Sequence, residues 1–215
     1  MNAVIFDIDG TLIESMDFDT ALYIKAVKNI LGALIIHYDW NYYRKVTDSG
    51  ILSEILKENG YDDPVPNISA VRSEFGKLMT EYLHGHHVEA LPGAVHLLQR
   101  MKSDSGFAVG IATGGWGHTA RLKLAAAGLD IHGIPLCSSD DSYEREGIME
   151  KCLSMMGSGF DAIYYVGDAE WDIAATHRLG WEFIGIGQIV QAKCKKWVID
   201  FKDETAFYNL VSLRS

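Results

Sequence analysis

The stretch Ala3-Val4-Ile5-Phe6-Asp7-Ile8-Asp9-Gly10-Thr11-Leu12 decides the fold of this chain. Its first four residues are apolar and are followed at once by two carboxylates, two positions apart, and a glycine. Like charges beside an apolar strand repel each other and are poorly solvated. Such a pair often serves chemistry or holds a cation, whereas an isolated Asp-x-Asp can equally cap a turn. We therefore treat Asp7 and Asp9 as candidate functional residues.

Composition narrows the classes of partner. The 215 residues are 48% hydrophobic and carry a net charge of −10. This length suits one domain, or a core domain with a small insertion. The negative charge argues against general affinity for nucleic acid, because phosphate backbones are bound through Lys and Arg. No apolar run reaches the roughly 18 residues that span a membrane, so we expect neither nucleic acid nor membrane as a partner.

The cysteines and the N-terminus bear on the cellular compartment. Cys137, Cys152 and Cys194 are odd in number and lack Cys-x-x-Cys spacing, which argues against a zinc site or a disulfide framework. The chain enters its first apolar strand without the basic region of a signal peptide. Both patterns predict a cytoplasmic protein with reduced thiols.

After Leu12 the apolar spacing changes from that of a strand to that of helices. It predicts helices over 17–31, 51–56 and 68–83, and a further short helix around Trp40, Tyr42 and Tyr43. Residues 15–88 thus form a compact helical unit. Within it, Arg44 and Lys45 either recognise a substrate anion or belong to a solvated helix face.

From residue 91 strands and helices alternate. Strands are predicted over 107–112, 134–137, 162–166, 183–186 and 197–200, and helices over 94–101, 118–127, 148–156, 172–179 and 205–211. This order indicates right-handed crossovers and a parallel sheet covered on both faces. We expect an α/β fold in which residues 1–14 and 89–215 form a doubly wound core and residues 15–88 an inserted helical cap.

Ligands of such sheets bind at the carboxyl ends of the strands, and two later strands end in reactive groups. The strand over 107–112 is followed by Thr113 and Gly114, a hydroxyl and backbone N–H group suited to phosphoryl oxygens. Taken alone, they equally fit an ordinary turn. The strand over 162–166 leads to Asp168, with Asp172 four residues later. Carboxylate oxygens suit Mg²⁺, although Asp172 can also serve as an acidic residue at a helix start.

The string Asp7-Ile8-Asp9-Gly10-Thr11-Leu12, Thr113 after a strand, and Gly167-Asp168 with Asp172 together resemble three motifs of the haloacid dehalogenase-like (HAD) hydrolases. The helical insertion resembles that family's C1 type of cap, so the resemblance covers the whole chain. It implies that Asp7 attacks phosphorus to form an aspartyl-phosphate, while Asp9 transfers protons. It further implies that Thr113 and Gly114 bind the phosphoryl group. Mg²⁺ would be held by Asp7, by Asp9 through its backbone carbonyl, and by Asp168, with Asp172 acting directly or through water.

The family's remaining motif departs from pattern here. Relatives place a lysine ahead of the helix that precedes Asp168, but the next cation in this chain is Arg145. Lys151 falls inside the predicted helix, about one turn beyond its start. Arg145 precedes that helix, and we predict that it faces the site, where Arg can brace phosphoryl and carboxylate oxygens without being equivalent to Lys. The alternative is a solvated arginine between Glu144 and Glu146.

The resemblance implies a Mg²⁺-dependent phosphomonoester hydrolase that acts on a small phosphorylated metabolite. Asp9 favours this branch, because relatives that cleave carbon–halogen or phosphonate bonds lack an acid at that position. A phosphomutase of the same family is an alternative, since it shares Asp-x-Asp. A catalytically degenerate phosphate-binding module is another, since the usual lysine is absent. The sequence leaves the substrate and the oligomeric state open.

Overall fold

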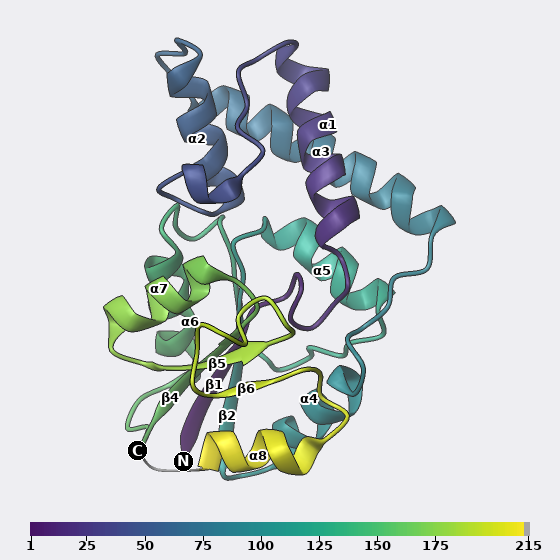
Figure 1. The fold of residues 1–215 in the computed structure, drawn as a ribbon. Helices are drawn as coiled ribbons and strands as arrows, with labels where there is room; N and C mark the ends of the chain where they lie inside the picture. Colours follow the sequence, from purple (N-terminus) through teal and green to yellow (C-terminus); the bar gives the residue numbers. More distant parts are fainter. Residues whose placement is uncertain (213–215) are drawn as a thin grey trace.

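The computed structural model describes residues 1–212 and has a parallel six-stranded sheet at its centre (Figure 1). The strand order is β3-β2-β1-β4-β5-β6, so the predicted doubly wound α/β fold is confirmed. β1 lies between β2 and β4 and is parallel to both. The strands are β1 (Asn2–Phe6), β2 (Phe107–Ala112), β3 (Leu136–Cys137), β4 (Ile163–Gly167), β5 (Glu182–Ile186) and β6 (Trp197–Val198).

Helices cover both faces of the sheet. Alternate residues of a strand point to opposite faces, and in β1 Phe6 joins one apolar cluster while Ile5 joins another. The cluster of Phe6 includes residues of α4 (Ala94–Ser103), α5 (Gly117–Ala126) and α8 (Glu204–Ser212). The cluster of Ile5 includes residues of α6 (Arg145–Met156) and α7 (Glu170–Leu179). β1 is therefore buried on both faces, which explains its unbroken apolar run.

The predicted helical unit forms a separate layer above the sheet (Figure 1). It consists of α1 (Met16–Leu31), the short 3₁₀ helix η1 (Trp40–Tyr42), α2 (Asp48–Glu58) and α3 (Val65–Gly85). Among the described residues, Trp116, which lies between β2 and α5, is the one fully buried member of its apolar cluster from outside the unit, and Leu122 and Tyr143 pack against the cluster. The Trp116 ring lies 5.7 Å from Tyr23 and 5.8 Å from Phe75 between centroids. Its Nε1–H donates a hydrogen bond of 2.8 Å to Ser49. A loop of the α/β core thus completes the interior of the helical unit.

Element boundaries differ from the predicted ones in two places that matter. The strands predicted over 134–137 and 197–200 shrink to two residues each, because these edge strands pair on one side only. The helix predicted over 148–156 begins earlier, at Arg145. Glu144 is extended and its carbonyl accepts the N–H of Ile148 at 3.2 Å. Arg145 is therefore the first residue of the helix and does not precede it.

Two further observations concern the chain as a whole. Within residues 1–212, no helix combines the length and apolarity needed to cross a bilayer. The three cysteines all lie in this range, and none of them forms a disulfide.

Candidate active site

Two neighbouring strands deliver the central carboxylates. Asp7 follows β1, and its backbone N–H donates to the carbonyl of Val166 in β4 at 2.9 Å. Asp168 follows β4 directly, and Asp172 lies in the first turn of α7. One carboxylate oxygen from each of Asp7, Asp168 and Asp172 lies within 4.8 Å of the others. The structure thus brings together three of the four aspartates that the sequence assigned to a metal.

Two glycines make this close approach possible. A Cβ atom on Gly10 would lie 2.1 Å from Oδ2 of Asp168, and the backbone of Gly10 has a φ of 77°. Such a φ is readily adopted only by glycine. A Cβ on Gly167 would lie 2.5 Å from Oδ2 of Asp172. The glycine after the second aspartate of the opening motif is therefore required by a carboxylate that lies 158 residues further along the chain.

Burial sets the electrostatics of this cluster. Loss of solvation raises the pKa of Asp7 to about 7, with Arg145 opposing the shift and Asp172 and Asp9 adding to it. Burial, followed by the charges of Asp172 and Asp7, raises the pKa of Asp168 to about 8. Oδ1 of Asp7 is buried and accepts no hydrogen bond. A hard divalent cation would neutralise these carboxylates and use their free oxygens, so the residues present fit Mg²⁺.

Arg145 is buried within the site, so a solvated surface arginine is the wrong interpretation. Its side chain is 10% exposed, and Nη1 lies 2.8 Å from Oδ1 of Asp172 and 3.6 Å from Oδ1 of Asp7. Nη1 also donates to the hydroxyl of Tyr165 at 3.1 Å. Although burial alone would lower it, the pKa of Arg145 is raised by Asp172, Tyr165 and Asp7. Lys151 is exposed on α6, so Arg145 supplies the cation at this end of the pocket.

Thr113 and Gly114 lie at the end of β2, beside Arg145. The Thr113 side chain is buried, and its hydroxyl oxygen accepts the N–H of Gly115 at 3.2 Å. Its hydroxyl proton is then available to a phosphoryl oxygen. A Cβ on Gly114 would lie 2.7 Å from Nη2 of Arg145. Both residues line the same pocket as Asp7, Asp9, Arg145 and Asp168.

Asp9 is held by a residue that the sequence analysis missed. Nζ of Lys123, in α5, lies 2.5 Å from Oδ1 of Asp9 and 2.5 Å from Oδ1 of Asp19, in α1. The Lys123 side chain is only 1% exposed, and the hydroxyl of Ser15 also donates to Oδ1 of Asp9. Burial alone would lower the pKa of Lys123, but the carboxylates of Asp19 and Asp9 raise it. The side chain of Asp9 therefore faces Lys123 and not the carboxylate cluster, where the family resemblance assigns its backbone carbonyl.

A sequence signal for Lys123 existed. Positions 120, 123, 124 and 127 share one face of a helix, and the other three are Ala120, Leu124 and Ala127. A lysine within such an apolar stripe either extends its ammonium to solvent or has a buried anionic partner. Lys123 is of the second kind, because its ammonium is paired with the carboxylates of Asp9 and Asp19.

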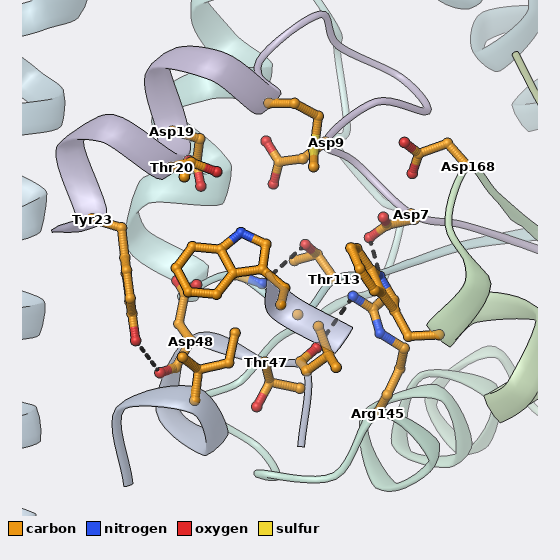
Figure 2. Close-up of a pocket in the computed structure, with 17 residues that line it drawn as sticks. Asp7, Asp9, Asp19, Thr20, Tyr23, Thr47, Asp48, Thr113, Arg145 and Asp168 are labelled. Carbon is orange, nitrogen blue, oxygen red and sulfur yellow. Dashed lines mark hydrogen bonds and ion pairs between the residues drawn. The ribbon is translucent and has the colours of Figure 1, made fainter. Parts of the chain in front are cut away.

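The helical unit forms the opposite wall of the pocket (Figure 2). In Figure 2, Asp19, Tyr23 and Asp48 lie on one side, and Asp7, Asp168 and Arg145 on the other. The backbone N–H of Asp48 donates to the carbonyl of Gly114 at 2.8 Å, and its Oδ2 accepts the backbone N–H of Trp116 at 2.9 Å. Burial, followed by the charge of Asp19, raises the pKa of Asp48 well above its usual range. The sequence analysis missed Asp48 as well, although it immediately follows Thr47, the cap of α2.

Comparisons with solved structures show the same fold. A hydrolase from Pseudomonas syringae is 25% identical, with a TM-score of 0.75, and the match covers 99% of this chain and 100% of that one. A β-phosphoglucomutase assigned as putative in Bacteroides vulgatus is 18% identical over 99% and 91% of the two chains, with a TM-score of 0.73. A predicted phosphoglycolate phosphatase from Haemophilus somnus is 20% identical over 96% and 97%, with a TM-score of 0.65.

The sequence itself decides the family. A comparison with curated proteins finds no match. The family model of the haloacid dehalogenase-like hydrolases, however, matches residues 1–180, which include all the candidate residues described above. The predicted family is confirmed, although the comparisons do not test the type of cap: this chain belongs to the haloacid dehalogenase-like hydrolases.

Proposed function

We propose that this hydrolase is a Mg²⁺-dependent phosphatase that cleaves the phosphate monoester of a small metabolite through an aspartyl-phosphate on Asp7. The observation that carries the proposal is the pocket in which Asp7, Asp168, Thr113 and Arg145 meet. It joins an anionic nucleophile to hydroxyl and guanidinium groups that suit a phosphoryl group. The similarity to a predicted phosphatase adds support.

In the first half of the reaction, a carboxylate oxygen of Asp7 attacks phosphorus and the ester P–O bond breaks. Asp9 gives a proton to the departing alkoxide. Oδ1 of Asp9 is held by Lys123 and Ser15, which leaves Oδ2 for this transfer. A Cβ on Gly115 would lie 3.8 Å from that Oδ2 and 3.6 Å from the Thr113 hydroxyl, so Oδ2 lies on the side of the phosphoryl-binding loop.

In the second half, Asp9 takes a proton from water, and the resulting hydroxide attacks the acyl-phosphate. The P–O bond to Asp7 breaks, and inorganic phosphate leaves. Bound Mg²⁺ would neutralise phosphoryl oxygens, and Asp7, Asp168 and the carbonyl of Asp9 are the groups proposed to hold it, with Asp172 in support. Because Arg145 lies 2.8 Å from Asp172, we assign Asp172 chiefly to orienting Arg145.

A phosphomutase is the second candidate, favoured by the similarity to the Bacteroides vulgatus protein named as a putative β-phosphoglucomutase. It would use the same Asp7 and Asp9 but return the phosphoryl group to another hydroxyl of a phosphorylated sugar. Such an enzyme holds two phosphate groups in one pocket. Transfer to water and transfer to a sugar phosphate are distinguished by whether inorganic phosphate accumulates.

The test is hydrolysis of p-nitrophenyl phosphate and a panel of metabolite phosphates with Mg²⁺. Asp7→Asn removes the nucleophile and is expected to lower kcat by at least about 1,000-fold. The matched control is Asp62→Asn, which removes a carboxylate that is exposed on the surface and leaves activity unchanged. Wild-type protein quenched in acid is expected to carry phosphate that hydroxylamine releases, as acyl-phosphates do.

Two results would contradict the proposal. One is wild-type protein that releases no phosphate from any ester, which supports a degenerate binding module. The other is release that survives Asp7→Asn in full.

A further inference from the structure

The wall that the helical unit contributes to the pocket carries no positive charge. Among the described residues, it consists of apolar, hydroxyl and acidic side chains, which include Asp19, Tyr23, Thr47 and Asp48. In the described part of the chain, Arg145 is the one cationic residue that lines this pocket. It belongs to the opposite wall, where it contacts Asp7 and Asp172. Arg145 is thus committed to the end where the phosphoryl group reacts.

The other nearby cations lie outside the pocket lining. Lys45, whose Nζ lies 2.9 Å from Oε1 of Glu144, pairs at the surface, and Arg44 is exposed. Neither of them lines the pocket, so the solvated face is the better interpretation of this basic pair. The ammonium of Lys123 is buried between two carboxylates. None of these three charges is placed to neutralise a second anion on a substrate.

At the start of α2, where Thr47 and Asp48 line the pocket, two backbone N–H groups are already engaged. Helix N-termini bind anions through free N–H groups. Here the N–H of Asp48 donates to the carbonyl of Gly114, and the N–H of Gly50 donates to the hydroxyl of Thr47 at 3.0 Å. The carboxylate of Asp48 itself occupies this end. A carboxylate accepts up to about four hydrogen bonds, and Trp116 uses one position of Asp48. Asp48 therefore keeps oxygen lone pairs for donors in the pocket.

From this arrangement we propose that the substrate carries a single phosphate and no other anionic group, and that hydroxyl or ammonium groups of its alcohol portion bind Asp48. The proposal rests on the proposed phosphatase function and names its substrate class. A second carboxylate or phosphate would be buried against Asp19 and Asp48 without a cation, which is costly.

Three esters with one carbon skeleton test the proposal. They are 2-hydroxyethyl phosphate, 2-aminoethyl phosphate and carboxymethyl phosphate (phosphoglycolate), which place a hydroxyl oxygen, an ammonium nitrogen and carboxylate oxygens, respectively, three bonds from the ester oxygen. We call carboxymethyl phosphate the carboxylate ester, 2-hydroxyethyl phosphate the hydroxyl ester and 2-aminoethyl phosphate the ammonium ester. We expect kcat/KM for the carboxylate ester to be at least about tenfold below that for the hydroxyl ester, because the carboxylate would have no cationic partner in the pocket. The ammonium ester is expected to match or exceed the hydroxyl ester.

A variant tests whether Asp48 selects between these substrates. Asp48→Asn keeps an oxygen to accept the N–H of Trp116 but removes the ionisable carboxyl group. We expect it to narrow the ratio between the hydroxyl and carboxylate esters by at least about threefold, chiefly through KM. Asp62→Asn is the matched control and is expected to leave the ratio unchanged. The wild-type ratio is informative without any variant, so the proposal stays testable even if Asp48→Asn fails to fold.

The outcomes separate this proposal from the one on which it rests. If p-nitrophenyl phosphate is hydrolysed but the carboxylate ester is as good a substrate as the hydroxyl ester, the substrate class is wrong and the phosphatase function stands. If Asp48→Asn leaves the ratio unchanged, Asp48 does not select the substrate. If no ester releases phosphate, the phosphatase function fails, and the substrate class fails with it.

Discussion

Lys123 carries a positive charge into the contact between α5 and α1, where Asp9 and Asp19 meet it at 2.5 Å each. Asp9 and Asp19 are 16% and 17% exposed, so solvent screens this triad only slightly. The arrangement fixes one oxygen of Asp9 and leaves the other for proton transfer. At the scale of a residue, Lys123 is therefore the side chain on which the position of the proposed acid depends.

Lys123→Met is expected to destabilise the protein by about 3 kcal/mol, because it leaves two facing carboxylates without their cation. It is also expected to lower kcat/KM for alkyl phosphates by at least about tenfold. The loss for p-nitrophenyl phosphate is expected to be smaller, since nitrophenolate leaves without a proton. Thermal melting and kcat/KM on the two esters measure these effects.

Lys123→Arg retains a cation and is the matched control, with a smaller loss of both stability and activity. Equal losses on the alkyl and aryl esters would show that Lys123 supports the fold alone and does not position Asp9.

Residues differ in how far the sequence predicts them. Asp7, Asp168 and Thr113 follow apolar strands, and because parallel strands end at one edge, the sequence was sufficient to predict their meeting. Arg145 was predicted to face the site from its place ahead of a helix, and its side chain does so from the helix's first turn. Lys123, Asp19 and Asp48 were missed because their partners lie 114, 104 and 68 residues away. Such pairings depend on how the helical unit packs on the core, which no local pattern encodes.

At the scale of an element, the turn after β1 depends on Gly10. Two separate features require glycine at this position: the left-handed backbone conformation and the close approach of the Asp168 carboxylate. Gly60, at the end of α2, has nearly the same φ of 79°, but a Cβ atom there would meet nothing within 4 Å. The two glycines thus separate the cost of backbone strain from the cost of displacing Asp168.

Gly10→Ala and Gly60→Ala are each expected to lose about 1–2 kcal/mol of stability from backbone strain. Only Gly10→Ala is expected to weaken Mg²⁺ binding and to lower kcat, because its methyl group displaces the Asp168 carboxylate. The measurement is the stabilisation of each variant by increasing Mg²⁺ in thermal melts, together with kcat. Equal Mg²⁺ responses in the two variants would argue against Asp168 as a ligand.

Elements were predicted best where both faces of the sheet bury them. β1, β2 and β4 have the expected bounds to within one residue at either end, because their apolar runs are continuous. The edge strands β3 and β6 are shorter than predicted, since one side of each lacks a partner. α2 extends beyond the predicted 51–56 because turns without apolar residues add helix at both ends, and α3 begins before the predicted 68–83, at Val65 and Pro66.

At the scale of the whole molecule, the buried carboxylates link stability to pH. An unfolded aspartate ionises near pH 3.8, whereas the folded protein holds the pKa of Asp7 at about 7 and that of Asp168 at about 8. Between these values the folded state binds more protons than the unfolded state. The free energy of unfolding therefore falls as the pH rises through this interval.

We expect Tm of the metal-free protein to fall by about 5 °C or more between about pH 5 and pH 8, since a unit of pKa is worth about 1.4 kcal/mol and 1 kcal/mol shifts Tm by about 2–4 °C at this size. Mg²⁺ binds the ionised carboxylates of the folded state, so it is expected to raise Tm more at pH 8 than at pH 5. Melts in EDTA and in Mg²⁺ measure both effects. Asp168→Asn is expected to flatten the slope, and an unchanged slope would contradict the assignment.

Trp116 has a consequence for building chimeras of this enzyme with its relatives. Its indole belongs to the apolar cluster of the helical unit, yet the chain encodes it in the loop that follows Thr113. If residues 15–88 alone were transferred to another protein, their apolar cluster would contain a cavity in place of the Trp116 indole. The unit that can be transferred is therefore discontinuous in sequence: it consists of residues 15–88 and the loop with Trp116. A graft succeeds only if the recipient's β2–α5 loop is exchanged together with its helical unit.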